Sequence, residues 1–129
     1  MSLAATYDRL TTIEIDRVIP LILGTIQKKS RVELGGVMVS VAGARLNTFA
    51  QKGTICARCG LHATHFAIER PAKRQNPSDG YHLNLWGKHG DREILFTRDH
   101  IVAKACGGPD TLENSQTMCQ PCNNKKGAS

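Results

Sequence analysis

The chain has 129 residues, enough for one compact domain or for a small domain with an additional arm. Hydrophobic residues make up 40% of it and aromatic residues only 5%, so we expect a small aliphatic core of the kind that often needs metal or disulfide support. The formal net charge of +6 suits contact with a polyanion such as nucleic acid, although ordinary surface charge explains this value equally well.

Hydropathy argues against a membrane protein. The most apolar stretch, Val18–Ile26, is too short to span a bilayer and contains Pro20. The first residues lack the basic and apolar regions of a signal peptide. We therefore expect an intracellular, cytoplasmic protein with no membrane partner, in which paired cysteines bind metal rather than form disulfides.

The first half of the chain predicts a helix, a strand and a second, shorter helix. Apolar residues recur at helical spacing across Thr11–Lys29, and the opening letters TTIE match a capping box with Thr11 as N-cap. Pro20 predicts a kink or a new start within this helix. The glycine-bracketed, β-branched segment Gly35–Gly43 predicts a strand, and Ala44–Gly53 predicts one or two helical turns.

Loops become frequent in the second half, and strands alternate with them. Four strands are predicted by alternating or β-branched patterns: Thr64–Glu69, Tyr81–Gly87, Arg92–His100 and Ser115–Cys119. The second and third of these are expected to form a hairpin. A helical turn or two should end the chain after the last strand. The predicted class is therefore α+β.

Two Cys-x-x-Cys pairs, Cys56/Cys59 and Cys119/Cys122, predict a metal site. Each pair can place two thiolates on one tight turn, and two such turns complete a tetrahedral site with one zinc ion per chain. Gly60 would give the first turn access to positive φ. Such a closed site leaves no position for substrate, so the zinc would be structural. Redox-active or merely buried cysteines stay as the alternative, although no thioredoxin-like pattern surrounds the pairs.

A second group of polar residues follows the third of these strands. Asp99 and His100 are adjacent at its end, where the chain can turn and bring both side chains to one cleft. Asn114 and Asn123 follow, and the zinc would fix the position of Asn123 because its neighbour Cys122 binds the metal. Taken singly, each of these residues is also typical of a surface, turn or cap position.

The combined pattern resembles a known family. The letters DHI, GG, D, LEN and MCQPCNNKKG, with CARCG upstream, look like the HNH endonucleases of the ββα-metal, treble-clef type, over roughly Gly53 to Gly127. The letters of the motif fall on His100, Asn114 and Asn123, and asparagine at the third position marks an HNN variant. The segment RLNTFAQKGTICARCG also looks like phage-borne members of the family, which would place the protein in a bacterial host.

The resemblance implies hydrolysis of DNA phosphodiester bonds with magnesium or manganese as the catalytic cation. His100 would be the general base that activates water, and Asp99 with the side-chain oxygen of Asn123 would hold the cation. Asn114 would brace the loop and hold His100 in its working orientation. The candidate phosphate contacts are Arg98, Lys104, Lys125 and Lys126.

Some alternatives stay open at this stage. The chain divides into residues 1–44, a helix and strand extension of unknown role that resembles nothing known to us, and residues 45–129, the nuclease domain. A non-catalytic zinc-binding module for nucleic acid, with its asparagines as caps, is the second interpretation. A zinc domain for protein interaction is a third, which leaves Asp99 and His100 unexplained. A homodimer and a phage or host protein partner are both compatible with the sequence.

Overall fold

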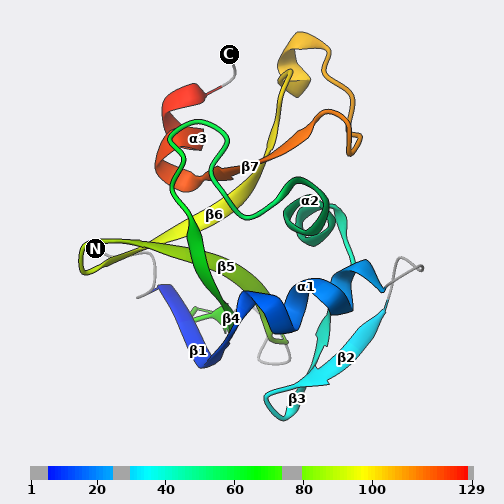
Figure 1. Ribbon diagram of the computed structural model, residues 1–129, viewed down its shortest axis with the longest axis vertical. Coiled ribbons are helices and arrows are strands. Elements are labelled where there is room, and N and C mark those ends of the chain that lie inside the picture. The colour runs from blue at the N-terminus through cyan, green and yellow to red at the C-terminus, as the bar shows by residue number, and fades with distance from the viewer. Residues whose placement is uncertain (1–5, 25–29, 74–79, 128–129) are drawn as a thin grey trace.

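The computed structural model of the chain describes residues 6–24, 30–73 and 80–127 (Figure 1). The strands within these ranges are β1 (Tyr7–Ile13), β2 (Arg31–Leu34), β3 (Val37–Ser40), β4 (Ala63–Pro71), β5 (His82–His89), β6 (Arg92–His100) and β7 (Ser115–Cys119). The helices are α1 (Ile15–Leu23), α2 (Ala44–Lys52) and α3 (Gln120–Lys126). Helices combined with antiparallel strands confirm the predicted α+β class.

Five of the strands form one antiparallel sheet in the order β1-β4-β5-β6-β7. β2 and β3 form a separate hairpin, whose turn uses the positive φ of Gly35 (60°) and Gly36 (87°), as tight two-residue hairpin turns require. This hairpin lies at one end of the molecule, whereas α3 and the loop between β6 and β7 lie at the opposite end (Figure 1).

Strand β6 changes partners along its length. Its register with β5 ends at the pair Trp86–Leu95, and from Phe96 to His100 it pairs with β7. β5 and β6 diverge beyond this point (Figure 1). The edge of β6 that faces β5 therefore has no strand partner from Phe96 onward among the residues that the structure describes.

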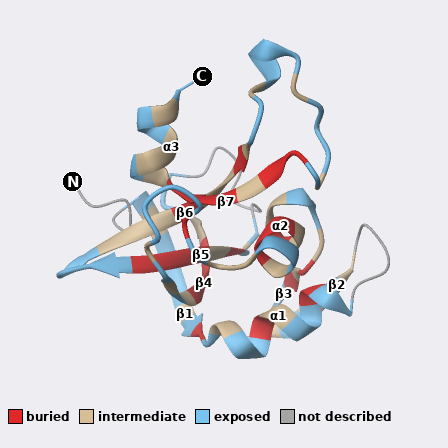
Figure 2. Cartoon of the chain, turned by 45° about the horizontal axis from the view of Figure 1, so that its top comes forward, coloured by how far each residue is buried: buried red, intermediate tan, exposed pale blue. Residues whose placement is uncertain are grey.

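The core lies between the sheet and helices α1 and α2, and most of its buried positions are on the strands and on α2 (Figure 2). Val18 and Ile22 of α1 are buried, as the helical spacing predicts. The expectation of an aliphatic core is incomplete, because the few aromatic residues are among the largest fully buried side chains: Phe49, Phe66, Trp86 and Phe96.

The predicted helix from Thr11 to Lys29 is wrong at its start. Thr11 belongs to β1, where it pairs with Ile68 of β4, and the helix begins only at Ile15. The TTIE segment is not a capping box, since Glu14 is the N-cap and makes no side-chain capping bond. Cross-strand pairing overrides the local helical pattern here, because Thr and Ile fit a strand well. Residues 25–29 of the predicted helix lie outside the described residues.

Other elements follow the sequence more closely. The helical turns at Ala44–Gly53 are confirmed as α2, and the four predicted strands of the second half are confirmed as β4 to β7. The strand within Gly35–Gly43 is β3, but its partner β2 was not foreseen. β1 comes from the proposed extension and joins the main sheet, and the division at residue 44 stays a prediction. Among the described residues, no helix has the length and apolarity needed to cross a membrane.

Candidate metal centre and active site

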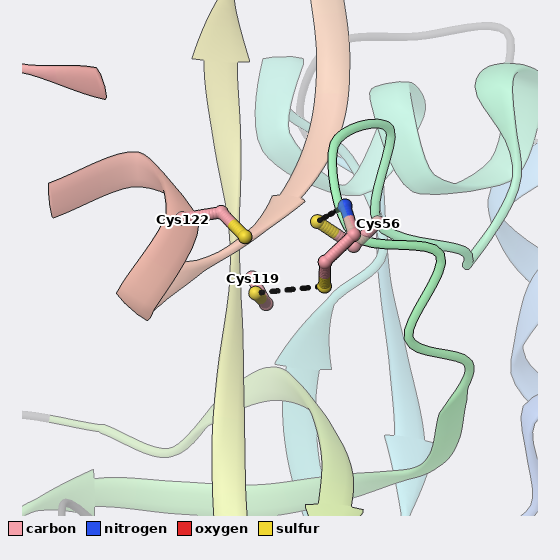
Figure 3. A group of neighbouring side chains, drawn as sticks. Cys56, Cys119 and Cys122 are labelled. Carbon is pink, nitrogen blue, oxygen red and sulfur yellow. Dashed lines mark hydrogen bonds between the residues drawn. The ribbon is translucent and has the colours of Figure 1, made fainter. Parts of the chain in front are cut away.

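The four paired cysteines meet at one point. Cys56 and Cys59 lie on the turn between α2 and β4, Cys119 ends β7, and Cys122 lies in the first turn of α3. Their sulfur atoms all lie within 4.8 Å of one another. Figure 3 shows the side chains of Cys56, Cys119 and Cys122 turned toward a common centre. The predicted cluster is confirmed by this geometry.

Local hydrogen bonds shape the first cysteine turn. Gly60 has a φ of 79°, the left-handed conformation expected from its place after Cys59, and its N–H donates to the carbonyl oxygen of Cys56 at 3.0 Å. The N–H of Ala57 donates to the carbonyl oxygen of Thr117 at 2.9 Å. The turn is thereby attached to β7, the strand that carries the third cysteine.

The sulfur cluster fits a bound metal ion such as zinc. Sγ of Cys59 and Sγ of Cys119 are 3.7 Å apart, close to the roughly 3.8 Å expected for two thiolates on a tetrahedral zinc. Burial opposes ionisation of Cys56, but backbone N–H donors from Cys59 and neighbouring residues lower its pKa to about 6. Burial raises the pKa of Cys119 and of Cys122. Because these thiols disfavour joint ionisation, a cation is what would hold them as thiolates.

A cleft of about 230 Å³ lies at the end of β6, beside α3. Its lining residues are Arg98, Asp99, His100, Ala103, Lys104, Asn123, Lys126 and Gly127. The structure thus brings Asp99, His100 and Asn123 together, as the sequence predicted. Lys125 lies apart from them and lines a neighbouring cleft with Arg58.

Asp99 is 6% exposed and its carboxylate is well supported. Its Oδ2 accepts hydrogen bonds from Gln116 Nε2 at 2.9 Å and from Lys126 Nζ at 2.7 Å. The same ammonium group contacts the carbonyl oxygens of His100 and of Ile101. Three oxygen atoms therefore surround the Lys126 ammonium at the edge of the cleft. Oxygen atoms of this kind are also the ligands that hard cations prefer.

The amide of Asn123 is oriented by Thr97. The Thr97 hydroxyl donates its single proton to the carbonyl oxygen of Met118 at 2.8 Å, so it can only accept from Asn123 Nδ2, which lies 2.9 Å away. The amide nitrogen consequently faces Thr97, and the amide oxygen faces away from it. This proton count assigns the direction in which Asn123 offers an oxygen ligand.

His100 is paired with a residue for which the sequence suggested no role. Its Nε2 lies 3.1 Å from Oδ1 of Asp110, which also accepts a hydrogen bond from Arg98. The Arg98 guanidinium, and after it the His100 imidazole, lower the pKa of Asp110 to about 2. An ionised carboxylate can only accept, so the proton lies on Nε2 of His100 and leaves Nδ1 as the basic nitrogen of the neutral ring.

Asn114 holds the loop that carries Asp110. Its side-chain oxygen accepts from the N–H of Val102 at 2.9 Å, and its Nδ2 donates to the carbonyl oxygens of Val102 and Pro109 at 3.0 and 2.8 Å. The side chain is buried beneath the loop and does not line the cleft. Any effect of Asn114 on His100 would therefore pass through the loop and Asp110.

Glycine is required where this loop folds back on itself. A Cβ atom on Gly108 would lie 1.7 Å from the carbonyl oxygen of Val102, far inside van der Waals contact. The N–H of Gly108 donates to the carbonyl oxygen of Ala103 at 3.0 Å. The GGPD segment thus places Asp110 beside His100 through a close approach that no other residue type allows.

Asp110 and Thr97 are the site residues that sequence reasoning missed. Asp110 was part of the quoted pattern, and its place within a loop closed by Asn114 was the signal that could have identified it. Thr97 gave no signal, because its contact with Asn123 depends on the packing of α3 against β6.

Comparison with known proteins finds a family match for the last part of the chain. The family model described as HNH endonuclease matches residues 88–129. No curated protein and no solved structure matches the chain. The matched segment contains Asp99, His100, Asn114 and Asn123, together with the second cysteine pair, and it indicates nuclease activity. Residues 88–129 therefore carry the HNH endonuclease family match that the sequence pattern predicted.

Proposed function

We propose that the protein is a divalent-metal-dependent endonuclease that hydrolyses phosphodiester bonds of DNA in the cleft at the end of β6. The observation that carries this proposal is the convergence of Asp99, His100 and Asn123 on one cleft with basic residues at its margin. The HNH endonuclease match over the same residues supports it independently. The four-cysteine cluster would hold a structural zinc.

His100 is the proposed general base. With its Nε2–H donated to Asp110, the ring offers Nδ1 to a water molecule and can take up a proton from it. The ionised Asp110 carboxylate would stabilise the imidazolium that forms, as a carboxylate partner does for a catalytic histidine. A positioned base of this kind contributes about 100- to 10,000-fold to the rate.

Asp99 and Asn123 are the proposed ligands of magnesium or manganese. Carboxylate and amide oxygens are the donor types these cations prefer, and the ammonium of Lys126 already marks the place as one that accepts a cation. A bound divalent ion would supply Lewis-acid stabilisation of charge on the phosphate and on the 3′ leaving oxygen. Lys126 uses the same carboxylate, so the cation must share or replace this ion pair.

Zinc would contribute by position alone. Cys122 directly precedes Asn123 in the first turn of α3, and α3 packs against β6. Fixing Cys122 to the cluster fixes the start of the helix and holds Asn123 against Thr97. The structural ion would thereby maintain the distance between the two proposed cation ligands.

Basic side chains at the cleft would bind the DNA backbone. Lys104 lies at the catalytic cleft, and Lys125 lies with Arg58 in the neighbouring one. Lys126 also lies at the catalytic cleft and would contact a phosphate once the cation replaces it on Asp99. Arg98 is already engaged by Asp110, so its charge would act mainly by fixing that carboxylate. Contacts of this kind position a phosphate without reading the sequence.

Cleavage of supercoiled plasmid by zinc-loaded protein tests the proposal. We expect nicked or linear product with magnesium or manganese, and loss of at least about 100-fold in rate for Asp99→Asn. Asp91→Asn, at the exposed turn between β5 and β6, is the matched control and should cleave like the wild type. Equal cleavage by Asp99→Asn and wild type would refute the assigned cation site.

A further inference from the structure

A second and larger cleft, of about 530 Å³, opens beside β6 where β5 leaves it. It is lined by Tyr7, Arg45, Glu69, Arg70, Pro71, His82, Asn84, Leu95, Phe96, Thr97 and Arg98. Nothing in the proposed mechanism uses this space. It is bordered by three arginines and one carboxylate, so its charge balance decides what it can bind.

The carboxylate of Glu69 already has hydrogen-bond partners on both oxygens. Its side chain is wholly buried, and it accepts hydrogen bonds from Arg9 Nε at 2.7 Å, Asn84 Nδ2 at 2.9 Å and Trp86 Nε1 at 2.7 Å. Arg9, which also pairs with Glu93 at 3.0 Å, offsets part of its charge, and the two further donors occupy its other oxygen. Glu69 therefore does not act as the counter-ion of Arg45 or of Arg70.

Arg45 and Arg70 have no carboxylate partner in the part of the chain that the structure describes. Arg45 donates to the carbonyl oxygen of Leu83 at 2.6 Å, and burial lowers its pKa. Arg70 stacks over the ring of Tyr81 at 4.7 Å, and its Nε is buried without a hydrogen-bond partner among the described residues. A buried donor on a guanidinium is costly when unpaired, and an anion is the group that would satisfy it.

The two clefts share one lining residue. Strand β6 lines the larger cleft from Leu95 to Arg98 and the catalytic cleft from Arg98 to His100, so Arg98 lines both. A DNA molecule held in the catalytic cleft would therefore lie beside the larger one.

We propose that this second cleft binds a phosphate of the DNA substrate through Arg45 and Arg70, outside the cleft in which the bond is cut. The inference rests on the proposed nuclease function. If the proposal is correct, residues outside the family match at 88–129 help to hold the substrate. β4 and α2, which carry these arginines, then serve the reaction as well as the fold.

Binding of a short DNA duplex to the Arg70→Gln variant tests the proposal. The measurement uses the full chain with bound zinc, the additional change His100→Ala to prevent cleavage, and no added magnesium. We expect the dissociation constant to rise about five- to tenfold and the slope of log affinity against log salt to weaken by about one ion. The matched control is Arg92→Gln, an exposed arginine at the start of β6, which should retain both values.

Single methylphosphonate substitutions then locate the contact. We expect one neutralised phosphate, other than the one at the cleaved bond, to weaken binding of the parent protein but not of the Arg70→Gln variant. Unchanged binding by Arg70→Gln, or equal sensitivity of both proteins to every neutralised phosphate, would overturn this inference. Cleavage by the protein with His100 intact is measured separately, and its absence would overturn the nuclease function instead.

Discussion

Nε2 of His100 lies 3.1 Å from Oδ1 of Asp110, and this contact decides which nitrogen of the imidazole can act as a base. Asp110 stays ionised because Arg98 binds the same oxygen. An acceptor-only partner on Nε2 leaves the lone pair of the neutral ring on Nδ1. The arrangement links a loop residue, Asp110, to the chemistry that His100 is proposed to perform.

Replacing Asp110 by asparagine should disturb this tautomer. The amide can donate as well as accept, so the ring is no longer confined to the form with the proton on Nε2. We expect kcat for DNA cleavage to fall about 10- to 100-fold, a typical cost of losing a supporting partner, with zinc content unchanged. Nitrogen-15 spectra of the His100 ring should show one neutral tautomer in the wild type and a mixture in Asp110→Asn; identical spectra would contradict the assignment.

The ionisation of Asp110 gives a prediction for pH dependence. Its pKa is lowered to about 2 in the folded protein, below the ordinary value of 3.8. Such a group contributes stability above its unfolded pKa and loses that contribution as pH falls through the folded pKa. Carboxyl carbon chemical shifts should therefore titrate near pH 2, and Arg98→Ala should raise the midpoint. An Asp110 midpoint near 3.8 in the wild type would disprove the Arg98 contact.

Two exposed cysteines allow a matched test of the metal site. Cys59 and Cys106 are both exposed, but only Cys59 belongs to the sulfur cluster. We expect Cys59→Ser to lose zinc and unfold, because a structural zinc contributes on the order of 10 kcal/mol to folding. Cys106→Ser should keep one zinc per chain, with four sulfur neighbours at about 2.3 Å by X-ray absorption. Equal zinc content and circular dichroism in the two variants would exclude the four-cysteine site.

Gly108 allows the loop to be tested without touching a charged residue. Alanine there would collide with the carbonyl oxygen of Val102, so the loop must shift and carry Asp110 away from His100. We expect up to about a 100-fold loss of cleavage, as small misplacements near a catalytic group produce. Gly80→Ala is the control, since its Cβ would meet no atom of the described residues within 4 Å. Full activity of Gly108→Ala would show that the loop does not position His100.

Some features could be predicted because they depend on spacing in the chain. The two Cys-x-x-Cys pairs predicted a common cluster, and Asp99, His100 and Asn123 were expected to share a cleft; both arrangements are present. The spacing of the ligands is local to each turn, so it does not depend on the strand order or register of the sheet. The second-half strands were found for the same reason, since alternation along a strand is a local property.

The remaining features depend on contacts between distant segments. Thr11 was assigned to a helix, yet it pairs with Ile68 across the sheet, and no local pattern reveals that partner. The link between Thr97 and Asn123 requires α3 to pack on β6. The second cleft is lined by residues of four strands and one helix, beside the point where β5 leaves β6. Register and strand order determine all three, and neither can be read from composition or periodicity.

The most direct measurement of the central claim is cleavage of supercoiled plasmid by zinc-loaded wild-type protein and by His100→Ala, with magnesium and then manganese. The account predicts cation-dependent cleavage by the wild type and a rate about 100- to 10,000-fold lower for His100→Ala, while zinc content and circular dichroism stay the same in both. Equal cleavage by the two folded proteins, or no cleavage by the wild type with either cation, would contradict it.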